Sequence, residues 1–206
     1  SIVSKISPLL SCRKNILKGN KGDVVFPSQI TSKWLSNHKE IDTNQIKLLY
    51  VGRIKKEKGI YSLLDIIKDS NSDLQLSIVG AEKKFLNQIT QKNVFVHEVE
   101  NNEQNLIKFY DDHNIFVLPS FTEGHPMALL EALSRLRPVI IFKDIEHVVG
   151  DKKGIFLAER NYTSFLKVIN HIKDNYKKIQ GEMKENKIPT KEQFLKSMNK
   201  LISKTS

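Results

Sequence analysis

Two carboxylates, Glu123 and Glu131, stand eight positions apart in the stretch FTEGHPMALLE at residues 121–131. Gly124 permits a tight turn, and Pro126 suits the first turn of a helix because its missing N–H would be unpaired there. The stretch therefore predicts a helix that starts near residues 125–126. The free N–H groups of such a helix start attract an anion, phosphate in particular.

Both acids can border the same pocket. Glu131 lies about 200° around the predicted helix from Leu129 at 3.6 residues per turn, so it need not face the core. Carboxylates only accept hydrogen bonds, and a vicinal diol supplies two donors that match them. An acid binds the ribose of dinucleotides for the same reason. Two acids beside an anion site therefore indicate a ligand with phosphate and hydroxyl groups, which is a nucleotide sugar.

A second stretch, VGRIKKEKG at residues 51–59, supplies cations for such a ligand. Arg53 can bind phosphate oxygens bidentately, and Lys58 adds a point charge. The sequence contains neither the GK[ST] ending of a Walker A loop nor a G-x-G-x-x-G fingerprint. ATP hydrolysis and NAD chemistry are therefore poorly supported.

Short apolar runs alternate with helical periodicities from residue 46 onward, and these elements must position the polar residues. Strands are predicted at 46–51, 74–79, 94–97, 115–118, 138–142 and 154–158. Helices are predicted at 60–67, through Phe85 and Ile89, through Leu106, Phe109 and Tyr110, at 129–136, at 162–178 and at 190–203. The alternation predicts an α/β fold, a Rossmann-like parallel sheet with helices on both faces and right-handed crossovers. The run VVFPSQI at 24–30 is one more candidate strand, interrupted at Pro27.

Unusual residues follow the ends of the predicted strands. They are Gly52, Arg53, Gly80, His97, Glu98, Pro119, Ser120 and Glu123. In open parallel sheets, ligands bind beyond the carboxyl ends of the strands. We therefore expect these residues to meet at one edge of the sheet.

Composition limits the classes of function. The net charge of +10 comes from the two ends, because residues 1–22 and 171–206 each carry about half of it and the middle is near neutral. That distribution disfavours nucleic-acid binding, whereas a basic end could meet an anionic membrane surface, an acidic partner or only solvent. Cys12 is the only cysteine, which excludes an internal disulfide and fits a reducing compartment. The histidines show no metal-ligand spacing, so no metal is expected.

The stretches VGRIKKEKG, IVG at 78–80, VFVHEV at 94–99 and PSFTEGHPMALLEALSRLRPVI at 119–140 together resemble the donor-binding half of a family 4 (group 1) retaining glycosyltransferase with the GT-B fold. The resemblance covers roughly residues 45–170, and its most specific part is the E-x7-E pair in an EGxPxxxxEA context. It divides the chain into an N-terminal extension or interlobe segment at 1–45, a Rossmann-like donor-binding domain at 46–180, and a connector with a C-terminal helix at 181–206.

The resemblance implies transfer of a sugar from a nucleotide diphosphate to a glycan or lipid-linked acceptor, with retention and without a metal or other cofactor. Arg53 and Lys58 would neutralise the diphosphate as it leaves, Glu123 would lie by the donor sugar, and Glu131 would hold the ribose. Glu123, Arg53 and Lys58 form the predicted catalytic set. The remaining predicted donor contacts are Gly52, Gly80, His97, Glu98, Ser120, Gly124, His125, Pro126, Met127 and Ala128.

The family pattern also implies what lies outside this chain. Residues 1–45 cannot supply the N-terminal acceptor lobe that the family uses, so we expect the chain alone to bind nucleotide weakly and to turn over little. A common role of the family in surface polysaccharide synthesis implies a cytoplasmic location, peripheral to the inner face of the membrane. Two departures stand out, because the family often has Gly where Leu136 and Glu98 stand.

Ordinary structural explanations and other functions stay open at this point. Glu123 could satisfy a helix dipole, and Glu131 could pair with Arg135 at i+4. His97 could fill a strand end, and His125 could either contact the donor or cap the helix. The chain could also be a noncatalytic sugar-nucleotide-binding module, or part of another GT-B enzyme such as a sugar-nucleotide epimerase.

Overall fold

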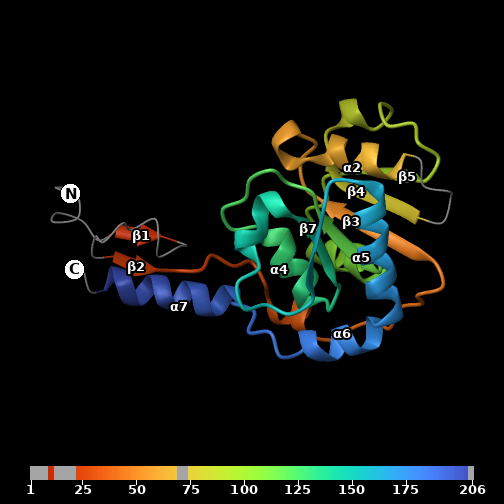
Figure 1. Cartoon of the computed structure of the whole chain (residues 1–206). Helices are drawn as coiled ribbons and strands as arrows, with labels where there is room; N and C mark the ends of the chain where they lie inside the picture. The colour runs from red at the N-terminus through yellow and green to blue at the C-terminus, as the bar shows by residue number, and fades with distance from the viewer. Residues whose placement is uncertain (1–8, 12–21, 69–73, 204–206) are drawn as a thin grey trace.

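A six-stranded, wholly parallel sheet forms the body of the protein (Figure 1). The computed structural model describes residues 9–11, 22–68 and 74–203. The strands are β3 (Ile46–Val51), β4 (Leu74–Ala81), β5 (Val94–Glu98), β6 (Ile115–Leu118), β7 (Val139–Phe142) and β8 (Ile155–Ala158). Their order across the sheet is β5-β4-β3-β6-β7-β8. The six predicted strands and the Rossmann-like α/β class are confirmed.

Helices cover both faces of this sheet. The α-helices of the described residues are α2 (Ile60–Ile67), α3 (Glu103–Asp111), α4 (Met127–Ser134), α5 (Tyr162–Asp174), α6 (Tyr176–Met183) and α7 (Lys191–Ile202), of which α7 lies away from the sheet. The chain moves outward from β3 to β5, crosses through α3 to β6, and then moves outward in the other direction. With right-handed crossovers, α2 and α4 therefore lie on opposite faces. Helix α5 contacts α2, and Tyr110 of α3 contacts Glu131 of α4.

The central strands are apolar on both faces because helices cover both. Leu48, Ile78, Phe116 and Ile140, one from each of the four central strands, are fully buried. Burying one such side chain stabilises the fold by about 1.5–3 kcal/mol. The sheet is therefore a rigid support for the loops that leave its carboxyl edge.

Two of the expected helices differ from the structure. The segment with Phe85 and Ile89 forms only one 3-10 turn, η4 (Lys83–Phe85). Polar side chains there bind backbone carbonyls instead, Gln91 that of Leu64 at 3.4 Å and Asn93 that of Leu74 at 3.0 Å. Such side-chain bonds compete with helix formation.

The helix expected at 162–178 is two helices, α5 and α6, which meet at Asn175. The backbone of Asn175 is non-helical (φ −117°), and its side-chain amide donates to the carbonyl of His171 at 2.9 Å. Helix α6 ends at Met183. It therefore runs into the segment 181–189, which was expected to be only a connector.

A short parallel pair of strands, β1 (Leu9–Ser11) and β2 (Gly22–Val24), lies apart from the main sheet and beside α7 (Figure 1). The strand expected at 24–30 is wrong in extent, because strand pairing ends at Val24. Residues 1–8 and 12–21 lie outside the described residues.

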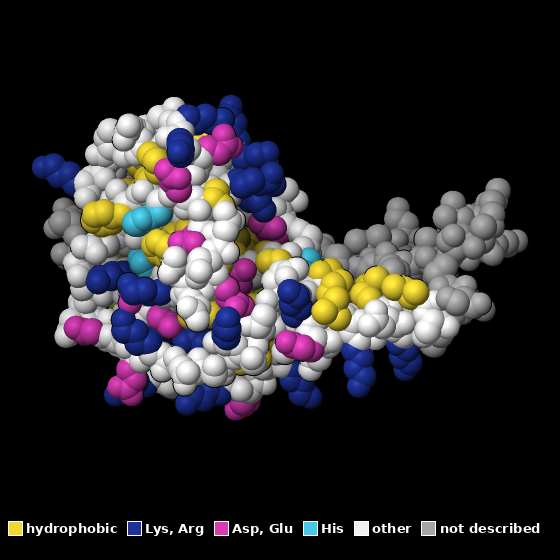
Figure 2. Space-filling model, turned by 180° about the vertical axis from the view of Figure 1, so that it is seen from behind, with side chains coloured by type: hydrophobic (Ala, Val, Ile, Leu, Met, Phe, Trp, Pro, Cys, Tyr) yellow, Lys and Arg dark blue, Asp and Glu magenta, His cyan; other side chains and the backbone are white. Residues whose placement is uncertain are grey.

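Helix α7 projects from the body, and apolar side chains lie along one side of it with basic ones along the other (Figure 2). Within the described residues, no helix combines the length and apolar character needed to cross a membrane. Contact of this basic end with an anionic membrane surface stays a prediction.

Two buried arginines fasten the segment before β3 to the body. The guanidinium of Arg135 pairs with both carboxylate oxygens of Asp111 at 2.9 Å, and Arg137 lies 3.6 Å from the same carboxylate. Both arginines are only 1% exposed. Arg135 also donates to the carbonyl oxygens of Lys33, Trp34, Ser36 and Asn37.

We expect Asp111→Ala to lower the free energy of unfolding by about 3 kcal/mol, because breaking a buried ion pair leaves uncompensated charge. The matched control is Asp112→Ala, which removes a neighbouring acid whose salt bridges with Lys39 and Lys108 are exposed. Its expected cost is at most about 1 kcal/mol. Urea unfolding of the three proteins measures both values, and equal costs would contradict the role of Asp111.

Candidate functional site

The strand order reverses between β3 and β6, and the predicted site residues lie at the carboxyl ends of these two strands. Gly52 and Lys58 follow β3, while Ser120 and Glu123 follow β6. Because the chain leaves β3 and β6 in opposite directions, a crevice opens there, and ligands of doubly wound sheets bind in such crevices.

A cavity of about 170 Å³ occupies this position. Its lining includes seven of the predicted donor contacts, Gly52, Lys58, Glu123, His125, Pro126, Met127 and Ala128, together with Tyr50, Val51 and Leu118. The start of α4 forms one wall, since Pro126 is its N-cap. The predicted helix start is therefore confirmed to within about two residues, and the first residues of the helix, Met127 and Ala128, border the cavity.

Glu123 and Lys58 form an ion pair inside this cavity. The Lys58 ammonium donates to Oε1 of Glu123 at 2.7 Å, and the hydroxyl of Ser120 donates to the same oxygen at 2.7 Å. The Glu123 side chain is only 9% exposed, and that of Lys58 is 25% exposed. His147 approaches the backbone carbonyl of Glu123 at 2.9 Å through Nε2. Lys58 and Ser120 therefore hold the carboxylate of Glu123, and His147 holds its backbone.

The loops that carry Lys58 and Glu123 pack closely on one another. The N–H of Phe121 donates to the carbonyl of Glu57 at 3.0 Å. Gly59 has φ +67°, and a Cβ atom there would lie 1.9 Å from the carbonyl oxygen of Pro119. Only glycine fits this contact.

Gly80 serves the same purpose one strand away. A Cβ atom on it would lie 2.7 Å from the carbonyl oxygen of Gly52, and its φ is +110°. It lies inside β4 instead of after it, and it does not line the cavity. Glycine at this position allows the ends of β3 and β4 to pack closely together.

Arg53 and Glu131 lie outside the wall of the cavity. The Arg53 side chain is exposed, and the described residues offer its guanidinium no salt bridge or hydrogen bond. Its carbonyl accepts from the hydroxyl of Tyr50 at 2.8 Å, which fixes the backbone. The cation is thus available at the rim, next to Gly52.

Glu131 stands one helical turn beyond Ala128, on the same side of α4. The buried hydroxyl of Tyr110 donates to Oε2 of Glu131 at 2.7 Å. Burial raises the pKa of Glu131, and the hydrogen bond from Tyr110 lowers it. Arg135 does not pair with Glu131, since its guanidinium binds Asp111.

His97 and Glu98 are not brought to the cavity. The ring of His97 packs against Phe109 of α3 at 4.9 Å between centroids, and burial lowers the pKa of His97. Glu98 is exposed at the end of β5. The strand alternation places the His97 side chain on the α3 face of the sheet and not at its carboxyl edge.

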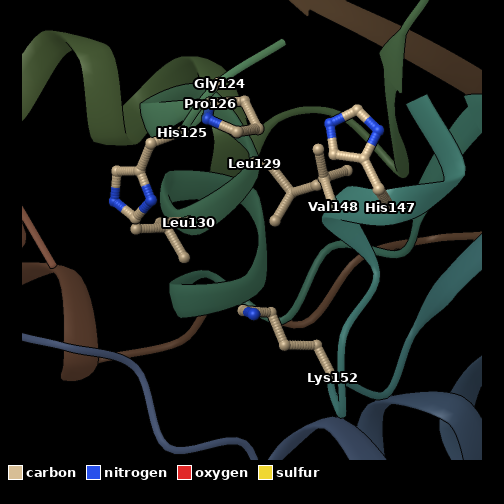
Figure 3. Close-up of a pocket in the computed structure, with 8 residues that line it drawn as sticks. All are labelled: Gly124, His125, Pro126, Leu129, Leu130, His147, Val148 and Lys152. Atoms are coloured by element: carbon tan, nitrogen blue, oxygen red, sulfur yellow. The ribbon is translucent and has the colours of Figure 1, made fainter. Parts of the chain in front are cut away.

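A smaller hollow of about 130 Å³ adjoins the start of α4 (Figure 3). His125 and His147 lie on opposite sides of the helix start, with Lys152 further along the helix. Gly124 lines this hollow and not the larger cavity. His125 binds the carbonyl of Pro27 at 2.7 Å through Nε2, so it holds the N-terminal segment.

Sequence reasoning missed Arg160, which positions the loop that bears Glu123. Its guanidinium donates to the carbonyl of Ser120 at 3.1 Å and to Asp144 at 2.9 Å. It stacks on the rings of Phe121 at 3.9 Å and Phe142 at 4.6 Å. Arg160 follows the carboxyl end of β8, so the rule that indicated Arg53 and Ser120 would also have found it.

Comparison with known proteins identifies the class. Residues 33–189 match the family of glycosyl transferases group 1, and the chain belongs to this family. The predicted resemblance is confirmed.

Particular relatives come from bacteria. TuaC of Bacillus subtilis (strain 168), a glycosyltransferase whose name assigns it to teichuronic acid biosynthesis, is 34% identical over 93 residues, which are 45% of this chain and 23% of TuaC. CapM of Staphylococcus aureus, a capsular polysaccharide biosynthesis glycosyltransferase, is 27% identical over 149 residues, 66% of this chain and 38% of CapM. The chain therefore spans less than half the length of these relatives.

Solved structures confirm the fold as one lobe of a GT-B glycosyltransferase. Anabaena Alr3699/HepE, solved in complex with UDP and glucose, superposes with a TM-score of 0.75 at 13% identity, over 96% of this chain and 63% of that protein.

We expect Glu131→Gln to raise the free energy of unfolding at about pH 7, because it removes a buried charge and keeps an acceptor for Tyr110. The Glu131 carboxyl has a higher pKa in the folded chain than its ordinary 4.5, so the folded state binds more protons. The stability of the unchanged protein therefore falls as the pH rises through this window. The advantage of the variant should vanish near pH 4, below about the ordinary pKa.

Urea unfolding at several pH values measures this difference. Glu182→Gln, at an exposed position of α6, is the control and should show no such pH-dependent gain. Equal stability of Glu131→Gln and the unchanged protein at every pH would contradict the buried charge.

Proposed function

We propose that this chain is the donor-binding lobe of a retaining glycosyltransferase that uses a nucleotide-diphosphate sugar and no metal. The observation that carries the proposal is the contact of Lys58 with Glu123 in the cavity at the start of α4, where the strand order reverses. A cation, an acid and free helix N–H groups together match a diphosphate joined to a hydroxyl-rich ring.

The diphosphate would lie against the start of α4. Lys58 has three N–H donors, so it can turn one toward phosphate while another stays on Glu123. Arg53, exposed at the rim, would close on the outer phosphate oxygens as a bidentate partner. These fixed positive groups would stabilise the charge that develops when the sugar leaves.

The two acids would bind different hydroxyl groups of the donor. Glu131, oriented by Tyr110, would accept hydrogen bonds from the ribose. Glu123 would lie beside the sugar ring and favour the positive charge that forms at its anomeric carbon. Ser120 and Lys58 hold the Glu123 carboxylate by one oxygen, which fixes its position toward the ligand.

Similarity to known proteins supports this donor class. The Anabaena structure contains UDP and glucose, and the names of TuaC and CapM refer to bacterial polysaccharides. We therefore propose a glycan or lipid-linked acceptor and a place at the cytoplasmic face of the membrane. Because the chain spans 23% of TuaC and 38% of CapM, transfer is proposed for this lobe together with an acceptor lobe.

Titration calorimetry with UDP-, GDP- and ADP-sugars tests the proposal. One of these donors should bind, and Arg53→Ala or Lys58→Ala should each weaken binding about tenfold to a hundredfold. The reason is that a hydrogen bond to a charged group contributes about 1.5–3 kcal/mol.

Lys55→Ala is the matched control, because Lys55 is exposed in the same loop and lies outside the cavity. It should leave the affinity unchanged. If all three variants bind like the unchanged chain, or if no nucleotide sugar binds, the donor site is wrong.

Metal independence has a test of its own. With Arg53, Lys58 and the α4 amides on the diphosphate, donor affinity should be the same in EDTA and in Mg²⁺ at equal ionic strength. A loss of about tenfold or more in EDTA would show that a cation bridges the phosphates instead.

A further inference from the structure

A second cavity lies far along the sheet from the donor site, on the α3 face over β3, β4 and β5. Its volume is about 430 Å³, against about 170 Å³ for the cavity at the start of α4. Volumes of about 300–1,000 Å³ are usual for small-molecule sites. It is lined by Lys47, Gln75, Ser77, Phe95, His97, Glu100, Asn105, Lys108, Phe109, Asp112 and His113.

The floor of this cavity is polar where a doubly covered parallel sheet is normally apolar. Lys47, Gln75 and Ser77 point to this face, while their neighbours Leu48, Leu76 and Ile78 on the other face are fully buried. In Figure 2, which shows the molecule from behind, histidine side chains lie beside apolar ones on the body, with basic side chains nearby.

The hydroxyl of Ser77 is fixed as an acceptor toward the cavity. His113 contacts the carbonyl of Phe109 through Nδ1 at 2.6 Å, and a carbonyl only accepts, so Nδ1 carries the proton. Burial lowers the pKa of His113 and favours the neutral ring. Its Nε2 then accepts the proton of Ser77 at 2.8 Å. The lone pairs of the Ser77 oxygen remain for a donor.

An aromatic surface and planar amides complete the walls. Phe95 is 46% exposed, although it stands beside Ser77 in the register of β4 and β5. Gln75 and Asn105 each offer both donors and an acceptor. An exposed ring face beside paired donors and acceptors suits a sugar, which has C–H groups on one face and hydroxyl groups at its edge.

Four charged side chains line the cavity, Lys47 and Lys108 against Glu100 and Asp112, so the lining carries no net charge. Asp112 already binds Lys39 and Lys108, and Glu100 accepts the backbone N–H of Asn102 at 2.7 Å. Among the described residues, no acid forms a salt bridge with Lys47. Lys47 is therefore the lining cation that a carboxylate of a ligand could meet without displacing a salt bridge among the described residues.

We propose that this cavity binds a segment of an acidic oligosaccharide, with one sugar ring on Phe95 and a carboxylate on Lys47. Gln75, Ser77 and Asn105 would bind the hydroxyl groups between them. Lys47, Gln75 and Phe95 stand on three adjacent strands, so the floor spans about 9–10 Å. The proposal does not rest on the donor site, because the two cavities share no lining residue.

Titration of the 206-residue chain with a galacturonic acid tetramer and with maltotetraose, a neutral tetramer of glucose, tests this site. The acidic tetramer should bind, and the neutral one should bind at least about tenfold more weakly. Phe95→Ala and Lys47→Gln should each weaken binding of the acidic tetramer about tenfold or more.

Two control variants match these changes in the side chain that is removed. Tyr61→Ala removes an aromatic ring that is 44% exposed on α2, on the other face of the sheet, and Lys173→Gln removes an exposed charge on α5. Neither should change the affinity. Equal binding of both tetramers, no binding of either, or an affinity that Phe95→Ala leaves unchanged would overturn the proposal.

Two further measurements separate this proposal from its rivals. Sedimentation equilibrium of the chain should give a monomer, and self-association that Phe95→Ala abolishes would assign the cavity to a second copy instead. A UDP-sugar titration of Phe95→Ala should match the unchanged chain. Binding of the UDP-sugar without binding of the acidic tetramer would contradict this inference alone. Binding of the tetramer without binding of the UDP-sugar would contradict only the proposed donor site.

Discussion

The ion pair of Lys58 and Glu123 joins the two halves of the sheet at their common border. Lys58 belongs to the half that begins with β3, and Glu123 to the half that begins with β6. Neither charge is well solvated, so loss of one partner would leave the other uncompensated. The loops therefore hold their positions before a ligand arrives, and such preorganisation reduces the free-energy cost of binding.

This pairing also limits what can attract an anionic ligand. Together Lys58 and Glu123 carry no net charge, so the initial attraction must come from elsewhere. Arg53 is exposed at the rim without a salt bridge to any described residue, and the start of α4 contributes the positive end of the helix dipole. An exposed cation can move to meet its ligand, while the buried pair keeps the geometry of the site. Under the proposed function, these separate roles would account for the position of Arg53 outside the cavity.

Most of the scaffold could be predicted from the sequence because its strands and helices are strongly periodic. The six strands, α2 and α4 follow from apolar spacing alone, and Pro126 marked the start of α4. The failures have local causes that spacing does not contain. Asn175 ends α5 through its own side chain. The segment of Phe85 forms no α-helix because Gln91 and Asn93 bind backbone carbonyls of other segments.

The candidate site could be predicted only from one rule, which is that residues at the carboxyl ends of parallel strands meet at one edge of the sheet. That rule found Gly52 and Glu123, which both line the cavity, whereas Lys58 was found from the cation-rich stretch at 51–59. The rule also selected His97, whose side chain belongs to the α3 face because strand residues alternate between faces. The same rule would have selected Arg160, but its contact with Ser120 joins residues 40 positions apart, and the spacing of residues along the chain does not predict that contact.

The buried arginines on either side of Leu136 hold its backbone in an unfavourable conformation. Leu136 follows the C-cap of α4 at φ +55°, a conformation that costs a residue with a side chain about 1–2 kcal/mol. The flanking residues, Arg135 and Arg137, are each fixed by Asp111 and by backbone carbonyls, so the turn between them cannot relax. The leucine side chain is 7% exposed, and its burial contributes about 1.5–3 kcal/mol, which offsets the strain. A leucine can therefore stand where a small residue is expected, because the same turn that strains its backbone buries its side chain.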